Sequence, residues 1–236
     1  MDDDRGWLPS SHCGRAGGLL DCYPVDKASS SVIAKLTRKL TLLRIHDRGL
    51  KVFGADAHGY EVVPVSLDDV LALEGEVEVK LPNEFRAWLL EVGCGAGPYY
   101  GLYSPSQITS AIGERSVGHG GDVLSAGGIK SRDVERYFAQ GGRSTSGTRY
   151  PITTDSLSGS ILIGHQGCTA HSCLLIAGEQ AGTMFGESED AVGEPWMAAT
   201  ALWPDHFSYK RRMENRSVSF FEWMEDWIDN AMDETP

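Results

Sequence analysis

Histidines and cysteines gather in one short stretch of the chain, where His165, Cys168, His171 and Cys173 lie within nine residues. Imidazole nitrogens and thiolates are preferred ligands of Zn²⁺, which takes four of them in a tetrahedron. Zinc ligands usually come as one close pair with a separate second pair, whereas a short hairpin turn places four donors around one ion only with difficulty. We therefore predict no metal and no cofactor, and these four residues are the candidate ligands if zinc binds.

A cysteine nucleophile is the second chemistry that the residues allow. Cys168 or Cys94 could be activated by His119, His165 or His171 acting as a base. The spacing locates neither a third group to orient the base nor an oxyanion hole. We therefore predict that the protein is not an enzyme, and a zinc or thiol hydrolase built on residues 165–173 is kept as an alternative.

The glycine-rich run Gly118-His119-Gly120-Gly121 superficially resembles a phosphate-binding loop. A phosphate loop ends in Gly-Lys-Ser or Gly-Lys-Thr and follows a buried strand, and both features are missing from this run. We interpret the run as part of a glycine-rich insertion at about 113–149, with one short helix near 133–140 between flexible flanks.

The net charge of −12, from 33 acidic and 21 basic residues, favours a basic partner and disfavours nucleic acid or an anionic membrane. No Lys or Arg occurs between Arg149 and Lys210, a stretch that holds seven acidic residues. This stretch is either a functional acidic surface or an ordinary solvated one. If the stretch is functional, the predicted contact residues are acids of the stretch together with aromatic residues in loop-like sequence. The first set is Glu187, Glu189, Asp190, Glu194 and Trp196, and the second set is Tyr99 and Tyr100.

We expect that the chain is not secreted by a classical signal peptide. Its sequence opens Met1-Asp2-Asp3-Asp4 where a signal peptide needs positive charge, and no run approaches the roughly 20 apolar residues that span a bilayer. The five cysteines are an odd number at irregular spacing, which is typical of reduced thiols. We expect a cytoplasmic protein.

Four amphipathic helices are predicted from apolar residues at helical spacing with capping residues at their starts. Two begin with capping boxes, Ser66 with Asp69 and Ser219 with Glu222. The predicted helices run from Ser31 to about Gly49, from Ser66 to about Gly75, from Pro82 to Gly93, and from Ser219 to near the C-terminus. The last one carries several large aromatic residues and should dock on a sheet.

Short β-prone runs alternate with turn residues over the rest of the chain. Residues 50–53 and 60–65 are predicted to pair as strands, with Pro64 placing the second at an edge. Residues 161–163, 174–177 and 183–186 are predicted to form an antiparallel meander. We predict an α+β fold with a mainly antiparallel (mixed) sheet flanked by helices, in one domain over 31–236 after a poorly ordered arm over 1–30.

Several of these segments occur in the order seen in one known family. They are residues 53–60 (FGADAHGY), 81–89 (LPNEFRAWL), 97–103 (GPYYGLY), a Gln-Gly-Cys turn at 166–168 between two strands, and a final helix with Trp223 and Trp227. Over about residues 32–231 the chain resembles the bacterial members of the SUKH superfamily, the Smi/Knr-type domains.

The resemblance implies an α+β fold and a binding function. Bacterial members of this family include immunity proteins, which bind and block polymorphic toxins that are often nucleases, and a fungal member regulates cell-wall synthesis. We therefore expect an immunity protein that neutralises a cognate, basic toxin domain through an acidic surface. The alternative is a regulatory scaffold of the cell-wall-regulator type, which would hold several partners.

Overall fold

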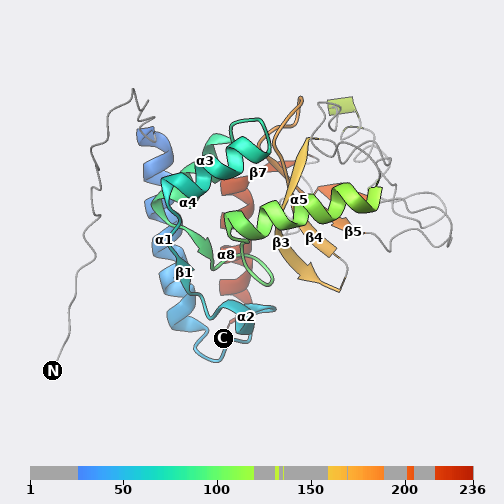
Figure 1. The fold of residues 1–236 in the computed structure, drawn as a ribbon. Helices are drawn as coiled ribbons and strands as arrows, with labels where there is room; N and C mark the ends of the chain where they lie inside the picture. Colours follow the sequence, from blue (N-terminus) through green and yellow to red (C-terminus); the bar gives the residue numbers. More distant parts are fainter. Residues whose placement is uncertain are drawn as a thin grey trace.

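The computed structural model describes residues 26–119, 131–132, 135, 159–168, 170–188, 201–204 and 216–235. These residues form helices and antiparallel strands, so the α+β class is confirmed (Figure 1). Of the predicted helix at 133–140 only residue 135 is described, and most of the glycine-rich insertion lies outside the described residues. No helix in the described part of the chain combines the length and the apolar character needed to cross a membrane.

The first helix, α1 (Lys27–His46), begins where the sequence supplies a cap. The Asp26 side chain accepts a hydrogen bond from the backbone N–H of Ser29 at 2.8 Å, which satisfies an amide that the helix itself leaves open. The predicted apolar stripe of this helix is buried. Residues 27–30 are therefore helical and do not belong to the poorly ordered arm that was predicted over 1–30. The cap at Asp26, which starts the helix earlier, was not recognised in the sequence.

Three further helices match the predictions closely. Both capping boxes are present, at the start of α3 (Leu67–Glu76) and at the start of α8 (Phe220–Glu234). The third, α4 (Asn83–Glu91), starts directly after Pro82, which serves as its N-cap, and buries Phe85 and Trp88 completely. These helices form as predicted because caps and apolar spacing act within a few residues.

The strand pair predicted over residues 50–65 is wrong. A single helical turn, α2 (Ala55–His58), lies there between Gly54 and Gly59, both with the positive φ angles that end regular structure. The two-residue strand β1 (Val62–Val63) pairs instead with β2 (Cys94–Gly95), which is remote in the sequence.

Helix α5 (Pro105–His119) extends into the stretch that was predicted to be loop. Ser104 and Gln107 cap its start, since the Ser104 N–H donates to Gln107 Oε1 at 2.8 Å and the Gln107 N–H donates to Ser104 Oγ at 3.3 Å. Gly113 and Gly118 therefore lie within a helix. Their helix-breaking tendency is overcome by the buried residues Ile108 and Ile112, which anchor the helix to the core.

The central sheet is an antiparallel meander, as predicted. β3 (Ser160–Gly167), β4 (Ala170–Leu175) and β5 (Thr183–Ser188) pair in that order. The free edge of β5 is shared by β6 (Ala201–Pro204) at one end and β7 (Val218–Ser219) at the other. Leu102 forms single bridges to both Gly95 and Gly164, so it connects β2 to β3.

The two faces of the sheet are buried by different elements. Ile161, Leu174 and Met184 belong to the main core, which also includes apolar residues of α1, α4 and α8. On the other face, Cys173 and Phe185 pack with Leu162 and Leu175 in a smaller cluster that Tyr103 and Ala111 cover. Figure 1 shows α8 beside α1 and α5 crossing near β3. The sheet therefore lies between helices.

Candidate protein-binding face

The turn that joins β3 to β4 uses both ring nitrogens of His165. The backbone N–H of Gly167 donates to His165 Nδ1 at 3.2 Å, and His165 Nε2 lies 3.1 Å from the carbonyl oxygen of Cys168. With Nδ1 accepting, Nε2 carries the proton and donates to that carbonyl. The imidazole therefore braces the turn and leaves no ring nitrogen for a metal ion.

The other candidate zinc ligands point to different environments. Cys168 is exposed at the turn, whereas Cys173 is completely buried in the cluster that includes Leu162 and Phe185. Among the described residues, no three His, Cys, Asp or Glu side chains lie close enough to hold a metal ion together. The hairpin therefore brings His165 and His171 together as a pair across β3 and β4, but it leaves Cys168 and Cys173 in different environments.

Cys94, a candidate nucleophile, lies in β2 and is 4% exposed. Burial raises the pKa of its thiol, and its Sγ donates to the carbonyl oxygen of Val63 at 3.6 Å. A nucleophilic cysteine needs a thiolate, which a lowered pKa supplies. The surroundings of Cys94 act in the opposite direction, so its geometry is that of a structural thiol.

The hairpin instead belongs to a chain of aromatic rings at the surface, which we call the aromatic cluster: Phe53, Tyr99, Tyr100, His165 and His171. Phe53 meets Tyr99 and Tyr100 edge to face at centroid distances of 6.5 and 5.6 Å. Tyr100 lies 5.5 Å from His165, which lies 5.0 Å from His171 on the neighbouring strand. Phe53 is 60% exposed and Tyr100 is 41% exposed. The cluster thus offers large, mutually supported rings to a partner.

The backbone beneath the aromatic cluster is closely fitted and locally strained. Tyr99 and Cys168 both have positive φ angles, 54° and 50°, which cost energy for residues other than glycine. A side chain at Gly54 would meet the carbonyl oxygen of Tyr99 at 2.1 Å. Such strain persists only where the surroundings impose it, so the backbone that carries these rings is held in place by its neighbours.

Asp47 anchors the segment that carries Phe53. Its carboxylate, in a residue only 2% exposed, accepts hydrogen bonds from Lys51 N at 2.7 Å, Val52 N at 3.0 Å and Tyr60 Oη at 2.7 Å. Burial by itself would raise the pKa of Asp47, but these three hydrogen bonds outweigh it and lower the pKa below its usual value. Asp47 therefore stays ionised and fixes both sides of the α2 turn.

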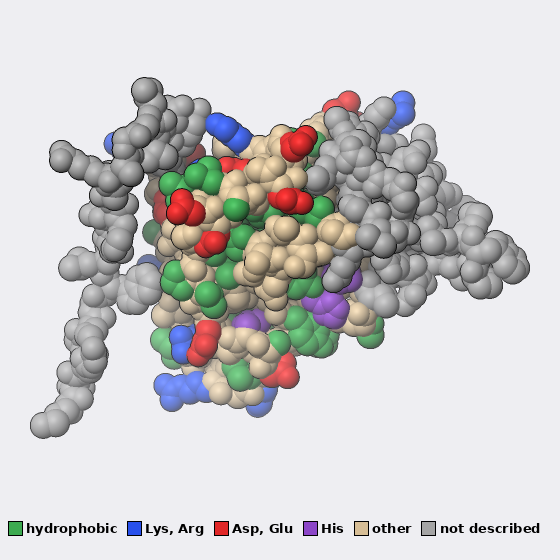
Figure 2. Space-filling model, in the orientation of Figure 1, with side chains coloured by type: hydrophobic (Ala, Val, Ile, Leu, Met, Phe, Trp, Pro, Cys, Tyr) green, Lys and Arg blue, Asp and Glu red, His purple; other side chains and the backbone are tan. Residues whose placement is uncertain are grey.

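A second exposed surface, the β1–α3 face, consists of Glu61, Val62, Val63, Leu67, Asp68 and Leu71. Its four apolar residues are 36–55% exposed, and Leu67 and Leu71 are one turn apart on α3. Residues 52–79 contain seven acidic residues and no Lys or Arg. Figure 2 shows apolar and acidic side chains gathered over α3 and β1, with histidines near the β3–β4 hairpin on the same side of the molecule. An apolar surface among acids suits a basic partner with apolar anchors.

Only part of the contact set predicted from the sequence lies at a described surface. Tyr100 is exposed, and Tyr99 is partly buried against the core. Glu187 is 3% exposed in β5, opposite His171 of β4, so it does not belong to an exposed acidic surface. The prediction for Glu187 is corrected: the residue lies in β5, inside the sheet between β4 and β6, and the fold covers the face from which its side chain projects. Glu189, Asp190, Glu194 and Trp196 lie outside the described residues.

The β1–α3 face was not predicted from the sequence, although the sequence contains one signal for it. Residues 52–79 contain no Lys or Arg, as does the stretch between Arg149 and Lys210, which was predicted to be the acidic contact surface. Exposure of Val62 and Val63 could not be read from the sequence, because these residues were assigned to a strand pair with a buried side.

No model of a protein family matches this chain, and a search of curated proteins returns no similar sequence.

Proposed function

We propose that this protein is a SUKH-type immunity protein, without catalytic activity of its own, that neutralises a basic toxin domain in the cytoplasm by binding it. The observation that carries the proposal is the β1–α3 face. Of nine large apolar residues that are exposed in the described part of the chain, four belong to this face, within a stretch over 52–79 that holds seven acids and no Lys or Arg. A monomeric soluble protein rarely keeps such a surface without a partner.

The family assignment within this proposal rests on the order of the elements. The segments on which the resemblance depends correspond to α2, α4, the β3–β4 hairpin with its Gly167-Cys168 turn, and α8. Cys168 at a positive φ angle gives that turn a conformational role, independent of any chemistry of its thiol. These features support the resemblance.

In the proposed mechanism, charged residues speed association with the toxin and apolar contacts slow its dissociation. Exposed acids such as Glu61 and Asp68 attract the substrate-binding surface of a basic toxin and raise the association rate. Val63 and Leu71, each about half exposed, would contribute about 1 kcal/mol apiece when covered, and so slow dissociation. The exposed rings of Phe53 and Tyr100 would add anchors of the kind that dominate binding energies. Covering the toxin's cleft is then sufficient to inhibit it.

The experiment is affinity capture from lysate of the source cells on the tagged full-length chain, at low and at high salt, followed by mass spectrometry. The expected result is one basic protein bound in stoichiometric amount. That protein should be toxic when expressed in a bacterial host, and co-expression of the present chain should restore growth. Many weakly bound proteins would instead favour the scaffold alternative.

Variants locate the contact. We expect Glu61→Lys combined with Asp68→Lys to weaken binding of the captured protein about tenfold at low salt, and less at high salt, because exposed charges are screened. Asp233→Lys combined with Glu234→Lys makes the same change in net charge on α8 and should leave the affinity nearly unchanged. Val63→Thr combined with Leu71→Gln should speed dissociation. Equal losses from both charge variants would show that net charge, and not this face, governs binding.

A further inference from the structure

Basic residues concentrate on α1 and just beyond it, against the overall charge of the chain. Residues 27–51 contain seven Lys and Arg residues and a single acid, Asp47, which is buried. This segment therefore carries a formal charge of +6, which leaves −18 on the rest of a chain whose net charge is −12. Helix α1 itself holds five of these seven basic residues and no acidic residue, so it is a basic helix in an acidic protein.

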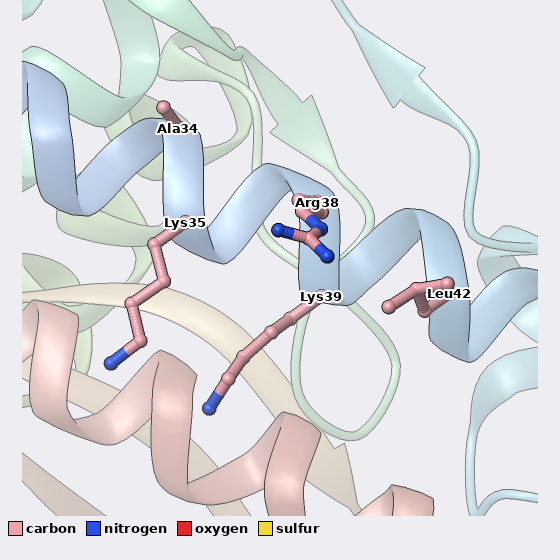
Figure 3. A pocket seen from close by; sticks show the side chains of 5 residues that line it. All are labelled: Ala34, Lys35, Arg38, Lys39 and Leu42. Carbon is pink, nitrogen blue, oxygen red and sulfur yellow. The ribbon is translucent and has the colours of Figure 1, made fainter.

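This helix borders a groove of about 510 Å³ lined by Ala34, Lys35, Arg38, Lys39 and Leu42 (Figure 3). Ala34, Arg38 and Leu42 follow one another at a spacing of four residues and form one row along the helix. Ile45, 51% exposed, and Leu42, 41% exposed, make the end of this row apolar. The row is therefore basic in its middle and apolar toward the C-terminus of α1.

The lysines and the arginine of the groove have different surroundings. Lys39 Nζ pairs with Glu225 at 2.7 Å and with Asp229 at 2.6 Å, and Lys35 also pairs with Glu225. Figure 3 shows Lys35 and Lys39 reaching from α1 toward the neighbouring helix, which these pairs identify as α8. Within the described part of the chain, Arg38 makes no ion pair, so its guanidinium is available to a partner.

We propose that this groove binds an acidic amphipathic helix of a second partner protein. From Ala34 to Ile45 the row spans about 17 Å, the length of a helix of about three turns. Ala34 has a small side chain that allows a close approach, Arg38 suits a carboxylate, and Leu42 with Ile45 suits the partner's apolar residues. Nucleic acid or an anionic membrane is a poorer occupant, because an extended anionic surface would also face the −18 carried by the rest of the chain.

This inference is independent of the proposed toxin contact, since it uses other residues and the opposite charge. With both surfaces occupied, the protein would hold a basic and an acidic partner at once. The acidic partner need not be a toxin, and its loss would leave toxin binding intact.

The test uses a synthetic, fluorescently labelled peptide of about three helical turns, with glutamates at a spacing of four residues in one half and leucines in the other. Its binding to the full-length chain is measured by fluorescence anisotropy. We expect saturable binding that weakens at least about tenfold with Arg38→Glu, and similarly with Leu42→Ser combined with Ile45→Ser. These residues are exposed, so the variants should fold, which circular dichroism checks.

Arg44→Glu is the matched control. Arg44 is also exposed on α1, but its position six residues from Arg38 places it about 120° around the helix. Its reversal should change the peptide affinity less than twofold. Absence of saturable peptide binding, or an equal loss from Arg44→Glu and Arg38→Glu, would overturn the proposal. So would stronger binding to vesicles of anionic lipid than to the peptide, or a dimer in ultracentrifugation that the Leu42 and Ile45 changes dissociate.

Discussion

Replacing Asp47 should destabilise the protein in a graded and pH-dependent way. In Asp47→Ala, the Val52 N–H and the Tyr60 hydroxyl lose a charged acceptor at buried positions, at about 1.5–2 kcal/mol each. The Lys51 N–H, which is only partly buried, can turn to water and adds about 0.5 kcal/mol. The expected loss is therefore about 4 kcal/mol, out of the 5–15 kcal/mol typical of a domain.

Two milder variants separate the contributions that the individual hydrogen bonds of Asp47 make to the stability of the fold. In Asp47→Asn, the amide oxygen can still accept from Val52 and Tyr60, while the NH₂ group faces the Lys51 N–H, so we expect a loss of about 1–2 kcal/mol. Tyr60→Phe removes a single hydrogen bond and should cost about 1 kcal/mol. Urea unfolding followed by the fluorescence of the buried Trp88 and Trp223 measures all three.

The pH dependence follows from the lowered pKa of Asp47. A carboxyl whose folded-state pKa lies below its unfolded value of 3.8 stabilises the fold above that value, and this contribution fades as the pH falls toward the folded-state pKa. The stability gap between the natural chain and Asp47→Asn should therefore be full at pH 7 and should narrow between about pH 5 and pH 3. A gap that stays constant over this range, or an Asn variant as stable as the natural chain at pH 7, would refute the reasoning.

Two further perturbations test the packing beneath the proposed surfaces. Gly54→Ala should destabilise the fold by more than about 2 kcal/mol, because the new Cβ would meet Tyr99 O at 2.1 Å. Gly59 also has a positive φ, but there is open space where its Cβ would lie, so Gly59→Ala should cost only about 1 kcal/mol. Urea unfolding measures both variants. Lys39→Met should lower the stability by less than about 1 kcal/mol, because the ion pairs with Glu225 and Asp229 are partly exposed. The stability difference should shrink in 1 M salt, which screens exposed charges. A difference that does not change with salt would assign the effect to packing of the lysine stem.

Local signals in the sequence were enough to place most of the regular elements. The cap residues Ser66 and Ser219, with the apolar spacing that follows each, define α3 and α8, because capping and amphipathicity act over four to eight residues. The meander of β3, β4 and β5 was also predicted, since its turns are short and its strands alternate with turn residues. These elements account for the α+β class.

Contacts between distant segments were decided only by the tertiary structure. Val62 and Val63 were assigned to a hairpin with residues 50–53, yet they pair with Cys94 and Gly95, which no local pattern near residue 62 encodes. The partner of a short strand depends on the whole packing arrangement, because two or three residues carry too little register information.

The candidate surfaces show the same division. The sequence by itself determined the chain's acidity, the segregation of basic residues near α1, and the presence of aromatic residues in the segment from Tyr99 to Tyr103. Only the fold decided that Glu187 is buried, that Phe53 meets Tyr100 and His165 at one surface, and that His165 braces a turn. Composition fixes which charges and rings a chain has, whereas exposure depends on which strands and helices lie against each residue.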